Sequence, residues 1–184
     1  MDLLSVLIIG GGLGGLALAQ SLKKNHIDFH VCEREQADHF VQTGYRIKIN
    51  ENGANALRFC LPEKLYDLYM ETSVFGPAHP VFLDPISLEP TEEQHPMYNK
   101  AEATPSVNRF TFREVLLGEL GDKVSFGYRF THYERLANGR LRAWFDHGEY
   151  MDADVLVGAD GGGSKVRHQY KPGVKIFDTG GRAL

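Results

Sequence analysis

The chain has 184 residues, the length of one ordinary domain or slightly more. Its composition is that of a globular protein, and its net charge of −4 argues against a general nucleic-acid binder, which is usually basic. The two cysteines, Cys32 and Cys60, lack the spacing of metal ligands or of a disulfide scaffold, so no metal is expected and a reducing, cytoplasmic compartment fits.

The first forty residues predict a βαβ unit. Residues 3–9 form an apolar run typical of a strand buried on both faces, residues 13–24 show helical spacing, and residues 28–32 predict a second strand. A secretory signal or membrane anchor is disfavoured because Asp2 replaces a basic start and glycines interrupt the apolar stretch. No membrane segment is expected elsewhere.

The remaining chain mixes short strands and helices. The patterns predict strands at 46–49, near Val81, and at 124–126, 149–151 and 154–157, helices at 53–59, 63–70 and 112–120, a long loop over much of 77–105, and a hairpin of 129–136 with 140–145 across Asn138-Gly139.

The turn after the first strand carries the pattern G-x-G-x-x-G at Gly10, Gly12 and Gly15. Its glycines allow a tight turn, close approach of a pyrophosphate, and close packing of helix on strand, while the helix N-terminus attracts phosphates. Glu33 follows at about the 20-residue spacing of the ribose-binding acid, where its charge disfavours a 2′-phosphate and therefore NADP. A turn used only for packing is the alternative, but it leaves Glu33 unexplained.

Three further segments carry a family resemblance. They are residues 158–167 (GADGGGSKVR), residues 109–116 (RFTFREVL, with Phe112 in place of a usual leucine) and residues 44–47 (GYRI). In this order the chain resembles the group A flavoprotein monooxygenases, the para-hydroxybenzoate hydroxylase-like family.

The resemblance implies an α/β fold: a Rossmann-like FAD-binding domain of the GR2 type over residues 1–184, with part of an antiparallel substrate-covering sheet at about 74–107 and 172–184. Members of the family are considerably longer and carry a later G-D-A-A-H-like segment that has no counterpart here. The chain is therefore expected to be truncated relative to the family, as a fragment, a split-gene half or a naturally shortened homologue.

The resemblance also implies a set of cofactor-binding residues. The glycine loop would hold the pyrophosphate, Glu33 the ribose, and the arginines the adenine, phosphates, ribityl chain or ring, while Asp160 would support the FAD loop and touch NAD(P)H. The full set is Gly10, Gly12, Leu13, Gly14, Gly15, Glu33, Arg34, Gly44, Arg46, Arg109 and Asp160.

For three arginines, a purely structural role competes with a role in ligand binding. Arg113 is expected on a helix surface, Arg34 fits a solvated charge at a strand end, and Arg167 is as well suited to brace the Asp160 loop as to touch a ligand.

The implied function is FAD-dependent monooxygenation with NAD(P)H and O2, on a small aromatic, polyketide or terpenoid substrate of secondary metabolism. The flavin would supply the oxygen chemistry, so no catalytic side chain is named. The alternatives are a non-redox role, as a small-molecule binder, a non-oxidative enzyme or an accessory subunit, and a less favoured NAD-dependent dehydrogenase. The expected partners are the small-molecule substrate and a second copy or a complementing C-terminal segment, but no nucleic acid.

Overall fold

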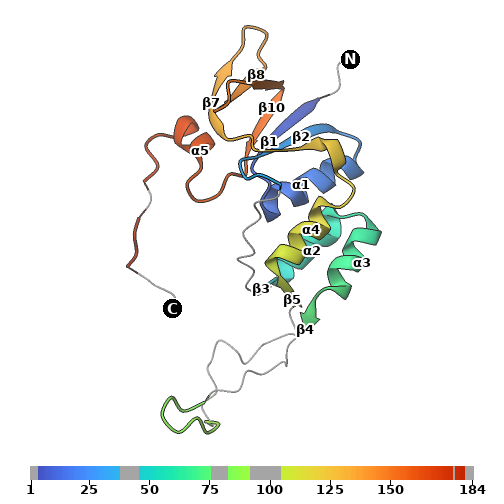
Figure 1. The fold of residues 1–184 in the computed structure, drawn as a ribbon, viewed down its shortest axis with the longest axis vertical. Coiled ribbons are helices and arrows are strands. Elements are labelled where there is room, and N and C mark those ends of the chain that lie inside the picture. The colour runs from blue at the N-terminus through green and yellow to red at the C-terminus, as the bar shows by residue number, and fades with distance from the viewer. Residues whose placement is uncertain (1–3, 38–45, 76–82, 92–104, 176, 181–184) are drawn as a thin grey trace. The chain divides into compact units, whose positions relative to one another are not determined.

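The computed structural model describes residues 4–37, 46–75, 83–91, 105–175 and 177–180 (Figure 1). The chain divides into two compact units, residues 1–41 with 119–184, and residues 42–118. Each unit is described by itself.

A four-stranded parallel sheet forms the centre of the first unit. Its order is β10-β1-β2-β6, and its strands are β1 (Ser5–Ile9), β2 (Asp28–Glu33), β6 (Val124–Phe126) and β10 (Val155–Gly158). The continuous apolar run of β1 follows from its central place, because side chains on both of its faces are covered. Ile8 is completely buried.

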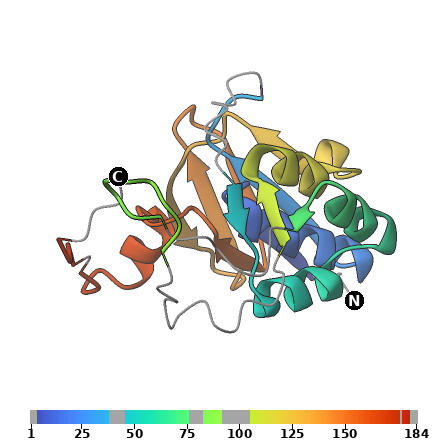
Figure 2. The same ribbon diagram turned by 90° about the horizontal axis from the view of Figure 1, so that it is seen from below.

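Two layers cover the parallel sheet (Figures 1 and 2). Helix α1 (Leu13–Lys24) lies against β1 and β2 and buries Leu16 and Ala19. The other face packs against an antiparallel sheet of β7 (Phe130–Arg135), β8 (Leu141–Phe145) and β9 (Tyr150–Ala153). The buried cluster between the two sheets contains Leu7, Ile9, Cys32, Phe130, Ala143, Phe145, Ala153 and Val166. Helix α5 (Lys165–Tyr170) follows β10.

The second unit pairs three helices with a small antiparallel sheet. The sheet has the order β3-β5-β4, from β3 (Arg46–Lys48), β4 (Val74–Phe75) and β5 (Pro105–Asn108), and the helices are α2 (Glu51–Cys60), α3 (Glu63–Glu71) and α4 (Arg109–Leu117). The rings of Tyr69 and Phe112 pack with centroids 5.1 Å apart in its core. Asparagine side chains cap α2 and α4, with Asn50 accepting from the Gly53 amide at 2.9 Å.

Most predicted elements are confirmed, but helix α4 is shifted and some elements were not predicted. Helix α4 begins at Arg109 rather than at residue 112, because the Asn108 side chain accepts hydrogen bonds from the amides of Phe110 and Thr111 and caps the helix there. Strands β4 and β5 and helix α5 were not predicted. The strand expected near Val81 lies outside the described residues.

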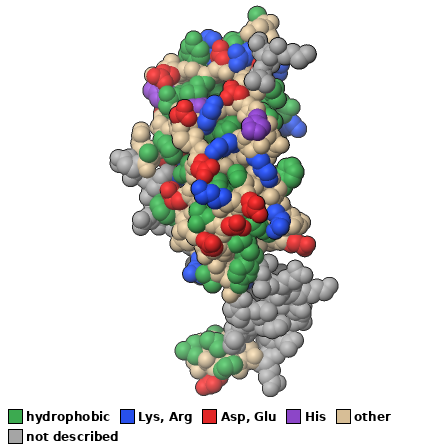
Figure 3. Space-filling model, turned by 90° about the vertical axis from the view of Figure 1, so that its right-hand side faces the viewer, with side chains coloured by type: hydrophobic (Ala, Val, Ile, Leu, Met, Phe, Trp, Pro, Cys, Tyr) green, Lys and Arg blue, Asp and Glu red, His purple; other side chains and the backbone are tan. Residues whose placement is uncertain are grey.

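The surface carries charges of both signs. On the face drawn in Figure 3, Lys and Arg side chains are interspersed with Asp and Glu side chains. No helix within the described ranges is both long enough and apolar enough to span a membrane.

Two backbone contacts set the position of α1. A Cβ added at Gly15 would overlap the carbonyl oxygen of Gly10 and lie 3.2 Å from the Cβ of Ala159. Gly10 adopts φ +112°, and a Cβ there would overlap the carbonyl of Ala159. Gly14 is different, since a Cβ there would have no atom within 4 Å. Helix α1 can therefore approach β1 and β10 only with glycine at positions 10 and 15.

We predict opposite effects for alanine at two neighbouring positions of α1. Gly15→Ala forces α1 away from β1 and lowers the free energy of unfolding by about 1–3 kcal/mol or more, the usual cost of overpacking. Gly14→Ala is neutral or raises this free energy by about 0.5–1 kcal/mol, because alanine is the better helix former. Urea unfolding followed by circular dichroism measures both, and equal stability of the two variants would contradict the packing described here.

Candidate functional site

Three strands of the parallel sheet end side by side at the candidate site. Strand β1 ends at Ile9, β2 at Glu33 and β10 at Gly158, and parallel pairing places these ends at one edge. The Ala159 amide donates to the Ile9 carbonyl at 2.8 Å, so the segment after β10 lies against the glycine loop. The carboxyl edge of such a sheet is the general place of ligand binding in open α/β folds.

The glycine loop presents backbone amides at the start of α1. The first amide–carbonyl bond of the helix runs from Leu16 to Gly12 at 3.0 Å, so the amides of Leu13, Gly14 and Gly15 precede the helical hydrogen-bond ladder. The first turn has no acidic residue, and a Cβ at Gly12 would meet no atom within 4 Å. Open space and a positive helix end together suit a phosphate group.

Glu33 is joined directly to this loop. Its side chain is only 8% exposed, and its carboxylate accepts hydrogen bonds from the Gly11 amide at 2.7 Å and the Glu35 amide at 3.0 Å. The Gly10 amide donates to the carbonyl of Cys32, the residue before Glu33, at 2.9 Å. The end of β2 therefore fixes the loop and places a negative charge beside it.

In the segment after β10, polar side chains accept hydrogen bonds from the first residues of helix α5. Asp160 accepts hydrogen bonds from the Ser164 hydroxyl at 2.5 Å and the Lys165 amide at 2.8 Å, and Ser164 accepts from the Arg167 amide at 2.9 Å. The Arg167 guanidinium donates to the carbonyl of Gly162, which is the bracing role considered for it. Asp160 thus organises the start of α5.

The predicted arginines lie in different parts of the fold. Arg34 is exposed directly after β2. Arg46 and Arg109 are exposed in the second unit, where Arg46 pairs in the β3–β5 ladder with Asn108, the residue before Arg109. Gly44 lies outside the described residues.

The expectation for Arg113 was wrong. Its side chain is 8% exposed, so it is not on the helix surface. The reason is tertiary packing: α4 contacts α3 and β5, and its buried side includes Arg113 together with Phe112, Val115 and Leu116.

Sequence reasoning also missed two features. It did not foresee that Glu33 binds the loop backbone, a contact that only the folded turn creates. It also missed the polar residues Asp28 and His30, whose alternation with Phe29 and Val31 in β2 was an available signal for a half-polar face. Burial raises the pKa of the Cys32 thiol to about 12, so the thiol is protonated at neutral pH. Within the described ranges no group of His, Cys, Asp and Glu side chains is arranged to hold a metal ion.

Comparisons with known proteins agree with this geometry. The family described as NAD(P)-binding Rossmann-like domain matches residues 8–54. A dual O-methyltransferase/FAD-dependent monooxygenase of Phaeosphaeria nodorum is 34% identical over 100% of this chain and 20% of its own length. The 6-methylsalicylate 1-monooxygenase of Aspergillus terreus is 29% identical over 89% of this chain and 38% of its own length.

Solved structures give the same result. A Photorhabdus luminescens protein assigned as an FAD-containing monooxygenase has 33% identity and a TM-score of 0.81, over 94% of this chain and 43% of its own. Klebsiella pneumoniae HpxO, solved with FAD and uric acid, has 26% identity and a TM-score of 0.69, over 90% of this chain and 41% of its own. The chain thus spans between a fifth and about two fifths of these relatives. In sequence and in fold, it is similar to the N-terminal portion of FAD-dependent monooxygenases.

Proposed function

We propose that this chain is the FAD-binding portion of an FAD-dependent monooxygenase, and that its glycine loop binds the ADP half of the cofactor. One observation carries the proposal: the Glu33 carboxylate is hydrogen-bonded to the Gly11 amide, directly beside the open space at Gly12. A dinucleotide needs both features together, an anion site for its pyrophosphate and an acid near its ribose.

The shape and charge of this edge fit such a ligand. The amides of Leu13 and Gly14 would face the pyrophosphate, and the negative charge of Glu33 favours a ribose with a free 2′-hydroxyl over a 2′-phosphate. Arg34 is exposed one residue beyond Glu33 and could neutralise phosphate charge. Arg46 and Arg109 are exposed and are proposed as further cofactor-binding residues, because guanidinium groups pair well with phosphate.

The proposed reaction of the whole protein is NAD(P)H- and O2-dependent hydroxylation or epoxidation of a small molecule. The flavin supplies the redox chemistry when bound, and the chain binds and orients it. The proposed substrate is an aromatic or polyketide-like compound, in keeping with the name of the Aspergillus terreus relative.

The proposal extends to domain organisation and partners. Residues 74–107 and 172–184 are assigned to the substrate-covering part, and a complementing C-terminal segment or a second copy would complete it. The support is the length of the relatives, of which this chain matches between a fifth and about two fifths. The cell compartment proposed is the cytoplasm.

We predict that a single methyl group weakens cofactor binding without disturbing the fold. Gly12→Ala leaves stability unchanged, because its φ of −77° suits alanine and its Cβ would meet no protein atom. The methyl group would occupy the space proposed for the pyrophosphate, so FAD affinity falls about 10-fold or more, which is at least ~1.4 kcal/mol. Quenching of flavin fluorescence during titration measures the affinity.

Gly173→Ala is the matched control, since a Cβ there also meets no atom within 4 Å and lies outside the glycine loop. It should bind FAD like the unmodified chain. If Gly12→Ala binds FAD as tightly as Gly173→Ala does, the pyrophosphate is not held at this loop.

We predict a bound-flavin spectrum when the purified chain is mixed with FAD. Addition of NADH or NADPH without oxygen should then bleach the visible flavin absorbance, because the flavin accepts the hydride. Flavin that binds but keeps its colour would contradict redox activity of this chain on its own and favour a non-redox role or a missing segment. The absence of any flavin binding in a folded sample would reject the cofactor itself.

A further inference from the structure

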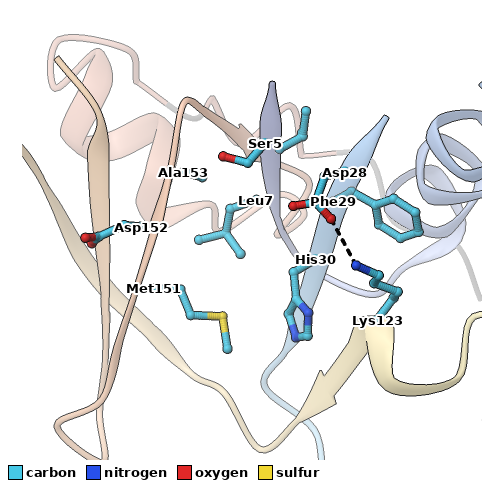
Figure 4. A pocket seen from close by; sticks show the side chains of 10 residues that line it. Ser5, Leu7, Asp28, Phe29, His30, Lys123, Met151, Asp152 and Ala153 are labelled. Carbon is cyan, nitrogen blue, oxygen red and sulfur yellow. Dashed lines mark hydrogen bonds and ion pairs between the residues drawn. The ribbon is translucent and has the colours of Figure 1, made fainter. Parts of the chain in front are cut away.

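The surroundings of β1 and β2 differ between the two ends of these strands. Near the carboxyl ends of β1 and β2, Ile9 and Cys32 are buried against Phe145 of β8. Near the amino ends, a pocket of about 310 Å³ lies between β9 and the starts of β1 and β2 (Figure 4). This volume is at the lower limit for sites of small organic ligands, which begin at roughly 300 Å³.

The pocket is lined by apolar and by polar side chains. Met151 is half-buried, whereas Leu7 and Ala153, which also line the pocket, are almost completely buried. Ser5 is a second uncharged polar residue of the lining beside His30. In Figure 4 the thioether of Met151 and the imidazole of His30 extend toward each other from β9 and β2. The His30 Nε2 atom lies 2.8 Å from the Ser125 hydroxyl, while Nδ1 has no hydrogen-bond partner among the residues the structure describes. One ring nitrogen thus remains for a ligand.

The charged groups around the pocket neutralise one another. Lys123 Nζ lies 2.9 Å from the Asp28 carboxylate at the rim. Asp152 points away from the space and accepts hydrogen bonds from the Arg142 guanidinium at 2.7 and 2.8 Å. Burial and the nearby Lys123 ammonium hold the pKa of His30 below its ordinary value, against the smaller opposing effects of Asp122 and Asp28. A charged ligand would have to displace one member of the Lys123–Asp28 pair.

From this lining we infer a second ligand site, which binds a small uncharged aromatic molecule carrying a hydroxyl group. The ring would lie against the half-buried Met151 side chain, since thioether sulfur makes favourable contacts with aromatic rings. The hydroxyl would hydrogen-bond His30 Nδ1, because a neutral imidazole has one donor and one acceptor nitrogen.

This site is separate from the proposed cofactor site. The pocket includes Ser5 at the start of β1, and the glycine loop follows Ile9 at its end. At about 3.3 Å per residue, the strand places the two sites roughly 13 Å apart along its axis. The inference therefore goes beyond the proposed function and can be tested independently of it.

The test uses the full chain, labelled with ¹⁵N and free of FAD, and titrated with 2-naphthol. Saturable shifts of the amide signals of Leu7, His30, Met151 and Ala153 are expected, with a dissociation constant of about 1 mM or tighter for a ligand of this size. The charged analogue 2-naphthoate should not produce them. Shifts that fail to saturate, shifts that centre on the glycine loop, or equal binding of 2-naphthoate would overturn the inference.

Two variants locate the ligand within the pocket. His30→Phe keeps a ring but removes the hydrogen bond, so 2-naphthol affinity should fall about 10-fold, the effect of one lost hydrogen bond. Met151→Phe should weaken binding by filling the space. His168→Phe, at an exposed position of α5, is the control and should bind like the unmodified chain. Dispersed spectra show that a variant is folded. If a folded His30→Phe variant binds 2-naphthol with unchanged affinity, the proposed hydrogen bond to His30 is contradicted.

Discussion

The close approach of three backbone segments is the constraint on which the rest of the first unit depends. Gly15 passes over the carbonyl of Gly10, and Gly10 in turn lies against Ala159. These contacts leave no room for a Cβ, so they fix the distance from α1 to β1 and from β1 to the segment after β10. The helix start is thereby held at the carboxyl edge of the sheet, where its free amides can meet a phosphate.

The two ends of the parallel sheet offer different chemistry. At the carboxyl end, the backbone amides of the glycine loop lie beside Glu33, which the Gly11 amide holds in place. At the amino end, side chains such as His30 and Met151 line a pocket beside β1, β2 and β9. The same strands therefore connect a site suited to an anion with a site suited to an uncharged ring.

Local sequence patterns predicted an element correctly where its side-chain pattern and its backbone preference favour the same structure. The apolar run of β1, the glycine turn and the helical spacing of α1 were all recognised, and so was the hairpin across Asn138-Gly139. Prediction failed where pairing with residues distant in the sequence determines whether an element forms. Strand β5 has no strong pattern of its own and exists because it lies between β3 and β4, and its last residue, Asn108, then starts α4 earlier than helical spacing suggested.

The sequence by itself determined the βαβ unit, the glycine loop and the acid that follows it, because glycine spacing and strand patterns are local properties of the chain. Only the tertiary structure decided that Glu33 binds the loop through Gly11, that Arg113 is buried, and that a pocket opens beside His30. The physical reason is the same in each case. These features depend on the distance and angle between elements far apart in the sequence, which packing sets and no local pattern contains.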